Sequence, residues 1–169
     1  MTIDLWGEIP EPGKEKTPFT ILWEQASLLQ KKTKFLQGRV RNVACTVKIK
    51  KRSELLSPEY ESSDANRTGQ KNLCYILEIV VPRLDNYSFG VLIISYNIDT
   101  IYPVDIEPLV IPDDDEYDYW ESFSCATEAN FLEGLKEILG SNEVKKVIQR
   151  LLAHIILEKG DGHTDESEE

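Results

Sequence analysis

Two apolar runs near the centre of the chain, residues 71–82 and 87–96, give the clearest structural signal. β-Branched and aromatic residues dominate both runs, and each run has the length of a strand. The link between them contains Asp85 and Asn86, which favour a tight hairpin turn. Because both faces of each run are largely apolar, we predict two central strands of a sheet that is covered on both sides.

A helix and a further strand are predicted before this pair. Thr17 and Pro18 have the chemistry of a helix N-cap and first turn, and Gly38 stands where a C-cap glycine would end the helix. From residue 39 to 51 apolar and polar residues alternate, which is typical of a half-buried strand near a sheet edge. The predicted helix has one broad apolar face, made of Ile21, Leu22, Leu28, Leu29, Phe35 and Leu36.

The second half of the chain combines weak strand signals with strong helix signals. Residues 101–112 are apolar but interrupted by prolines, so we expect any strand there at an edge or beside a bulge. Residues 120–124 could add one short strand. Thr127 and Ser141 are predicted to cap two helices, of which the first ends at Gly140.

Together these elements predict an α+β fold. It comprises an N-terminal helix, an antiparallel meander of about four to five strands, and two C-terminal helices packed on the sheet. Because the central strands are apolar on both faces, we expect the first helix and the C-terminal pair to cover opposite faces. A homodimer that buries one face is the alternative.

Length and composition favour a single domain over residues 1–157. Within it, residues 1–16 are rich in glycine and proline and are predicted to form an irregular lead-in. Residues 53–70 are polar and are predicted to form a long mobile loop, and residues 158–169 a disordered acidic tail.

Charge is distributed unevenly along the chain. The net charge is −11, yet residues 30–52 contain nine basic residues and no acid, whereas residues 105–121 contain eight acids and no base. The acidic total disfavours binding to nucleic acid and to anionic membranes. The basic block either neutralises the acidic block within the molecule, which is the interpretation we favour, or contacts an outside ligand.

Cysteine usage and hydropathy suggest where the protein resides. Cys45, Cys74 and Cys125 form no CxxC pair, and we interpret them as buried free thiols of a reduced compartment. The chain has no apolar run long enough to span a membrane, and its first residues lack the pattern of a signal peptide. A cytoplasmic location is therefore predicted.

No motif indicates a catalytic residue, a cofactor or a metal ion. The acidic run 113–118 lacks the glycine that a calcium-binding EF-hand loop needs at its sixth position. Pro112 and Asp113, with Glu143 and Lys145, resemble elements of the PD-(D/E)xK nucleases, which would imply a divalent metal ion. In that family the Glu and Lys lie on a strand, whereas here a helix is predicted, so a nuclease-like site is the remote alternative.

Glu78 interrupts the apolar sequence of the first central strand and allows two interpretations. It either pairs with a Lys or Arg of the basic block, because buried charges are normally compensated, or belongs to a functional site. The second interpretation gives an alternative function, a small-molecule-binding or enzymatic pocket under the curved sheet. We expect such a pocket to be lined by Tyr75, Glu78, Tyr96 and Tyr102.

The leading hypothesis is a non-enzymatic, acidic protein-interaction module. A small acidic α+β domain of this kind resembles immunity proteins and other small inhibitors that cap basic enzymes, which would imply a basic protein partner. Aromatic residues beside acids suit an interface with anchor residues and an electrostatic rim. The predicted contact surface comprises Asp113, Asp114, Asp115, Glu116, Tyr117, Tyr119 and Trp120.

Overall fold

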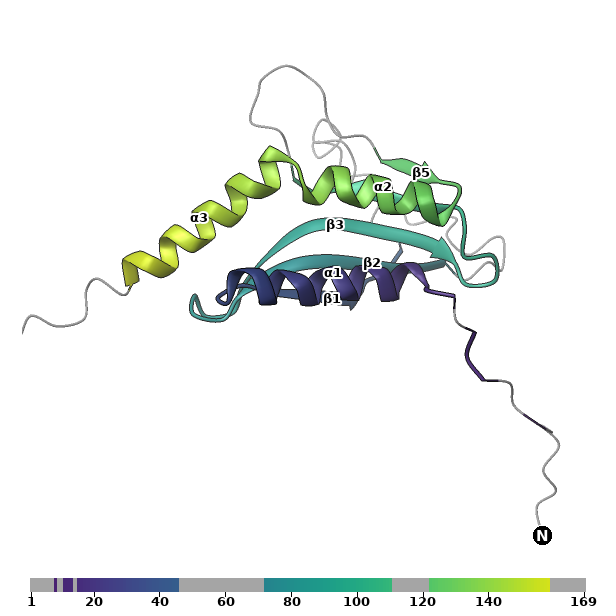
Figure 1. Ribbon diagram of the computed structural model, residues 1–169, viewed down its shortest axis with the longest axis horizontal. Coiled ribbons are helices and arrows are strands. Elements are labelled where there is room, and N and C mark those ends of the chain that lie inside the picture. The colour runs from purple at the N-terminus through teal and green to yellow at the C-terminus, as the bar shows by residue number, and fades with distance from the viewer. Residues whose placement is uncertain (1–7, 9–10, 14, 46–71, 111–121, 159–169) are drawn as a thin grey trace, which may run out of the picture.

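The computed structural model describes residues 8, 11–13, 15–45, 72–110 and 122–158 (Figure 1). Its helices are α1 (Pro18–Thr33), α2 (Glu128–Leu139) and α3 (Asn142–Glu158). Its strands are β1 (Gln37–Asn42), β2 (Asn72–Val81), β3 (Tyr87–Asn97), β4 (Val104–Pro108) and β5 (Phe123–Cys125). The described strands form one antiparallel sheet in the order β1-β2-β3-β4-β5, so the predicted α+β meander and its flanking helices are confirmed.

Helix α1 begins where the sequence predicts but ends earlier than expected. Its start is capped by Thr17, whose hydroxyl oxygen accepts a hydrogen bond from the backbone N–H of Thr20 at 3.2 Å. Its end is set by Lys34, which adopts the left-handed backbone conformation with φ 61°. The expected helix end at Gly38 is therefore wrong.

Gly38 instead allows β1 and α1 to approach each other closely. A Cβ atom on Gly38 would collide with main-chain atoms of the buried residue Ala26 on α1. Only glycine leaves enough room for two backbones at this separation. The alternating segment predicted as a strand over residues 39–51 is a strand only to Asn42, and its residues 46–51 lie outside the described residues.

Strands β2 and β3 form the predicted central hairpin. Asp85 and Asn86 in its turn have positive φ angles of 52° and 56°, which these residue types tolerate. Between Leu77 and Glu78 the pairing shifts by one residue, and Val91 is the additional residue of a β-bulge.

Strand β4 was predicted to lie at a sheet edge or beside a bulge, but it lies inside the sheet. It pairs with β3 on one side and with the short strand β5 on the other, where Val104 lies opposite Cys125. Pro103 precedes the strand and Pro108 ends it, so neither removes a backbone donor from the part that pairs on both sides. The short extra strand expected over 120–124 is β5.

Helices α1 and α2 cover the same face of the sheet, which corrects the expectation of opposite faces. Phe19 on α1 contacts Tyr75 on β2, with 4.8 Å between the ring centroids. Tyr75 pairs with Ile94, and Ile94 pairs with Ile106, and directly paired residues project from one face. Gly134 on α2 packs on Ile106 from that same side.

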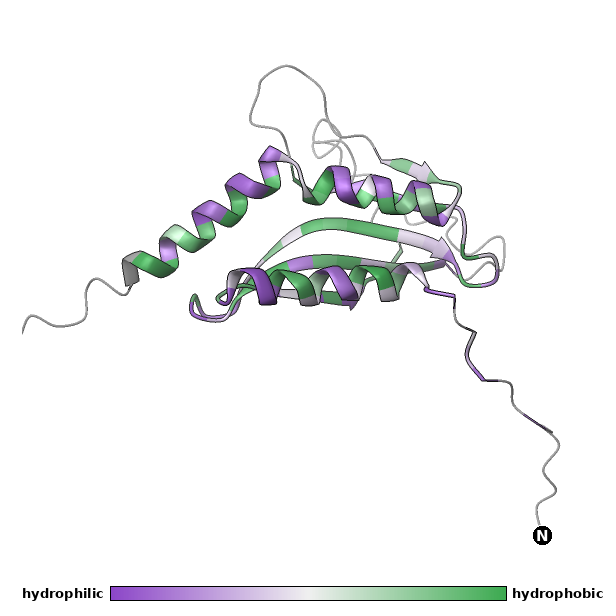
Figure 2. Ribbon diagram, in the orientation of Figure 1, coloured by the Kyte–Doolittle hydropathy of each residue, from purple (hydrophilic) through white to green (hydrophobic). Residues whose placement is uncertain are grey.

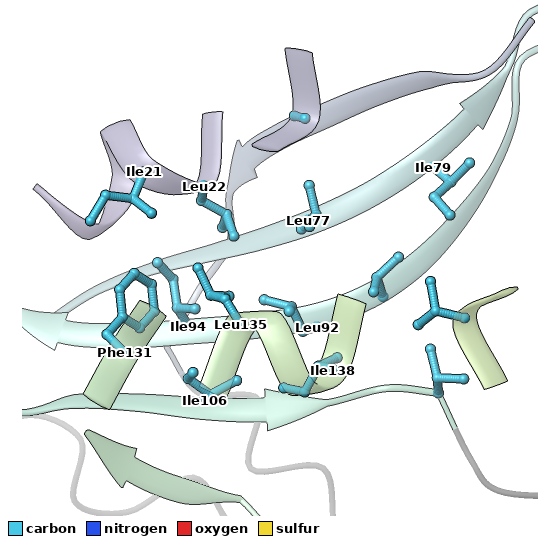
Figure 3. Close-up of a cluster of buried hydrophobic side chains, with 14 of the residues drawn as sticks. Ile21, Leu22, Leu77, Ile79, Leu92, Ile94, Ile106, Phe131, Leu135 and Ile138 are labelled. Carbon is cyan, nitrogen blue, oxygen red and sulfur yellow. The ribbon is translucent and has the colours of Figure 1, made fainter. Parts of the chain in front are cut away.

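The shared core lies between these two helices and the central strands. Figure 3 shows side chains from α1, α2, β2, β3 and β4 converging there, and they belong to one buried cluster. In Figure 2 hydrophobic residues dominate β3 and alternate with hydrophilic residues along the helices. The labelled side chains of Figure 3 are Ile21, Leu22, Leu77, Ile79, Leu92, Ile94, Ile106, Phe131, Leu135 and Ile138.

Helices α2 and α3 begin at the residues predicted to cap them. Thr127 accepts a hydrogen bond from the N–H of Asn130 at 3.2 Å, and Ser141 accepts one from the N–H of Val144 at 3.3 Å. Gly140 ends α2, again as predicted. No helix in the described part of the chain is long and apolar enough to cross a membrane.

Candidate functional site

The other face of the sheet carries the polar chemistry. Alternate residues of the strands project away from the core, and none of the described helices packs over them. We refer to this surface as the helix-free face. Its residues include Arg39, Arg41, Cys74, Ile76, Glu78, Ile93, Ser95, Asp105, Glu107 and Ser124.

Glu78 is the buried charge of this face, and two arginines of β1 compensate it. Arg39 Nη2 lies 2.8 Å from Glu78 Oε2, and Arg41 Nη2 lies 2.9 Å from Glu78 Oε1. Burial alone would raise the pKa of Glu78, but the hydrogen bonds and positive charges of Arg41 and Arg39 outweigh it and hold the pKa below its usual value. Glu78 is therefore paired with the basic block, and these two members of the block are engaged within the molecule.

This ion-pair cluster leads to a pH-dependent prediction. Glu78→Gln is expected to lower the free energy of unfolding at pH 7 by about 1–3 kcal/mol, because charge-assisted hydrogen bonds to both arginines are lost. The folded pKa is depressed, so this contribution is complete above the unfolded pKa of about 4.3 and disappears as the pH falls through the folded value. Urea denaturation at pH 7 and at pH 3 would measure it, and the difference between wild type and variant should shrink at pH 3.

Glu24→Gln is the control for this experiment, because Glu24 on α1 forms an exposed ion pair with Lys16, which precedes the helix. It should change stability by less than about 0.5 kcal/mol at either pH. A Glu78→Gln effect that is equally large at both pH values would show that the loss comes from packing and not from the charge.

A cavity of about 450 Å³ opens on the helix-free face. One row of directly paired residues crosses its floor from β2 to β5: Cys74, Ser95, Asp105 and Ser124. Glu107 lies two residues from Asp105 on β4, on the same side of the strand. The two carboxylates therefore share a hollow that also has hydroxyl groups and the apolar side chain of Ile93.

The two carboxylates of the cavity differ in their surroundings. Asp105 is exposed, whereas Glu107 is half-buried. Burial raises the pKa of Glu107, because its carboxylate has lost part of its hydration. A cation in the cavity would restore the compensation that water no longer supplies.

The interpretation of all three cysteines as free thiols is wrong, because two of them form a disulfide. Cys45, which follows β1, forms a disulfide with Cys74 on β2, with 5.4 Å between their Cα atoms. Cys125 is free and 2% exposed, and burial together with the negative charge of Asp105 raises the pKa of its thiol. Spacing in the sequence could not reveal the bridge, since only the pairing of β1 with β2 brings the two residues together.

The residues predicted for a pocket under the sheet do not converge on one site. Tyr75 and Tyr96 lie on the core face, with 6.2 Å between their ring centroids, whereas Glu78 lies on the helix-free face. The hydroxyl of Tyr102 is buried and has no hydrogen-bond partner among the described residues. Burial raises the pKa of Tyr102, and the charges of Glu128 and Cys125 add to this rise.

The other predicted sites cannot be placed or are not assembled. The proposed contact residues Asp113, Asp114, Asp115, Glu116, Tyr117, Tyr119 and Trp120 lie outside the described residues, as does Pro112. Glu143 and Lys145 lie in the first turn of α3 and not on a strand. Within the described ranges no three His, Cys, Asp or Glu side chains are grouped as a metal site would require.

A second hollow of about 500 Å³ lies between α3 and the central hairpin. Leu84, Tyr87 and Phe89 form its hairpin side, and α3 contributes Arg150 and His154. It is mainly apolar, and nothing in its chemistry matches a residue singled out from the sequence as functional.

Comparison of the chain with known protein families, with characterised proteins and with solved structures finds no match.

Proposed function

We propose that the protein is a non-enzymatic interaction module that binds a basic polypeptide on the helix-free face of its sheet. The observation that carries this proposal is the cavity in which Asp105 and Glu107 lie side by side. A Lys or Arg side chain has the charge to pair with these carboxylates and an aliphatic stem to lie on Ile93. The cavity volume of about 450 Å³ is sufficient for one such side chain.

The charge of the rest of the chain favours the same kind of partner. The net charge of −11 attracts a basic protein over long distances and raises its rate of association. Asp105 and Glu107 are also the first two acids of the acidic block 105–121, which contains the contact residues predicted from the sequence. Asp113, Asp114, Asp115, Glu116, Tyr117, Tyr119 and Trp120 therefore stay part of the proposed partner surface.

The proposed class of protein is the one inferred from the sequence, a small cytoplasmic inhibitor or immunity-like protein. Under this proposal the helix-free face supplies an anchor site and the acidic block supplies the electrostatic rim. A homodimer through the same face is the alternative assembly, and it would make the carboxylates of one copy face those of the other. That repulsion favours a basic partner over a second copy.

A small organic cation is the second candidate ligand, because the cavity alone could hold it. It would need only the two carboxylates and the serine hydroxyls of the floor. The two candidates differ in size, so a free amine such as arginine amide and a basic peptide distinguish them experimentally.

Neutralising the cavity should weaken binding of a basic peptide by about tenfold or more, since paired interfacial charges contribute at least that much. The variant is Asp105→Asn with Glu107→Gln, and the probe is a fluorescently labelled peptide rich in Arg and Lys. Fluorescence anisotropy at low and at physiological salt measures the affinity. The free energy of unfolding should change by less than about 0.5 kcal/mol, because the double variant removes two like charges, one exposed and one half-buried, that repel each other.

The matched control is Glu133→Gln with Glu137→Gln, which removes the same charge from two exposed positions on α2, on the core side of the sheet. Equal weakening by both double variants would mean that only net charge matters and would contradict a site on the helix-free face. Binding of arginine amide as tightly as the peptide would favour the small-cation function.

A further inference from the structure

The wall of the cavity contains a disulfide. Cys45 and Cys74 both line the hollow that holds Asp105 and Glu107. Cys74 is buried in the floor, whereas Cys45 is exposed at the rim. The residue at one end of the bridge is thus exposed to solvent, and the residue at the other end is buried beside the cavity.

This bridge also fixes the residues that follow β1. Among the described residues, the last backbone hydrogen bond between the two chain segments runs from the N–H of Val43 to the carbonyl of Cys74, at 3.0 Å. Ala44 and Cys45 lie beyond that bond and still form part of the cavity wall. The covalent link therefore holds the wall in place where the described sheet ladder no longer does.

We propose that the Cys45–Cys74 disulfide is a thiol–disulfide exchange site whose reduction opens the cavity wall and lowers affinity for the basic partner. The effect on affinity rests on the proposed function, whereas the exchange chemistry does not. The reacting partner is a low-molecular-weight thiol such as glutathione or the dithiol of an oxidoreductase. In the cytoplasmic location proposed above, such thiols are abundant and can attack an exchangeable disulfide.

The exchange proceeds in two balanced steps. A thiolate attacks the Sγ of the exposed residue Cys45, a new S–S bond forms, and the Cys74 sulfur leaves as a thiolate that takes up a proton. A second thiolate then attacks the mixed disulfide on its external sulfur and releases Cys45 as a thiolate. Two external thiols are oxidised to one disulfide, and the protein disulfide gains two electrons.

The third cysteine is excluded from this exchange by its position. Cys125 pairs with Val104 on the core face of the sheet, whereas the disulfide lies on the helix-free face. Its thiol is buried, and few thiolates form because its pKa is raised. The disulfide consequently exchanges with external thiols and does not rearrange within the chain.

Mass spectrometry and peptide binding test the two parts separately. Oxidised full-length protein is incubated with glutathione, quenched with acid and digested, and a glutathione adduct is expected on Cys45 and not on Cys125. Affinity for the labelled Arg- and Lys-rich peptide is then expected to fall about three- to tenfold on reduction and to return on reoxidation. Cys125→Ser should behave as wild type, and Cys45→Ser with Cys74→Ser should show the lower affinity with or without reductant.

Each result decides between the proposals. Absence of an adduct on Cys45, or reduction that occurs only when the protein is unfolded by urea, would overturn the exchange site. Unchanged peptide affinity on reduction, with weaker binding still seen for Asp105→Asn with Glu107→Gln, would overturn the regulatory effect and leave the proposed function standing. No peptide binding by the oxidised protein would instead reject the proposed function, and the adduct on Cys45 would then judge the exchange site alone. Circular dichroism of the reduced protein separates an open wall from global unfolding.

Discussion

Phe131→Ala is expected to lower the free energy of unfolding by about 3–5 kcal/mol, the usual cost of truncating a fully buried aromatic side chain. Phe131 on α2 has no exposed surface and belongs to the core shared by α1, α2 and the sheet. In Figure 3 its ring lies with Ile94 and Leu135, so the truncation would leave a cavity that neighbouring side chains cannot fill completely. Urea denaturation followed by circular dichroism measures the change.

Leu132→Ala is the matched control, because Leu132 is the next residue of the same helix and is 44% exposed. It should cost less than about 1 kcal/mol, since little apolar surface is removed from the core. Similar losses for the two variants would contradict the orientation of α2 on the sheet, and with it the finding that both helices share one face.

Gly38→Val is expected to lower the free energy of unfolding by about 3 kcal/mol, at the upper end of the range for overpacking. Valine favours strands, so local propensity alone would predict a gain. The side chain, however, would collide with main-chain atoms of Ala26, and a backbone cannot move aside as a flexible side chain can. The helix and the strand would have to separate, and the same denaturation experiment reports the loss.

Gln37→Val controls for this change, because it adds the same residue type to the adjacent, exposed position of β1. It should change the free energy of unfolding by less than about 0.5 kcal/mol. A stable Gly38→Val protein would mean that α1 does not rest directly on β1.

The fold could be predicted from the sequence where the signal is local. The hairpin of β2 and β3 follows from two apolar runs around Asp85 and Asn86, and the helix starts follow from the short polar side chains of Thr17, Thr127 and Ser141. These features depend on residues within a few positions of one another. The helix end at Lys34 escaped prediction because no residue type there favours a left-handed backbone.

The arrangement of elements and the site could not be predicted, because both depend on strand register. The two faces of β2 are both largely apolar, with Asn72 and Glu78 as the exceptions, so the pattern did not show which face the helices cover. The cavity brings together Ser95, Asp105 and Ser124 from three strands. The disulfide joins Cys45, which follows β1, to Cys74 on β2. Only the paired register brings such distant residues into one row.

The meander order also determines how the chain is expected to fold. Each described strand pairs with its neighbours in sequence, so most ladders close small loops and the contact order of the sheet is low. The pairing of β1 with β2 is the exception, because it closes the long segment between Asn42 and Asn72. We therefore expect the hairpin of β2 and β3 to form first, with β4 adding to one side of it and β1 docking later on the other side.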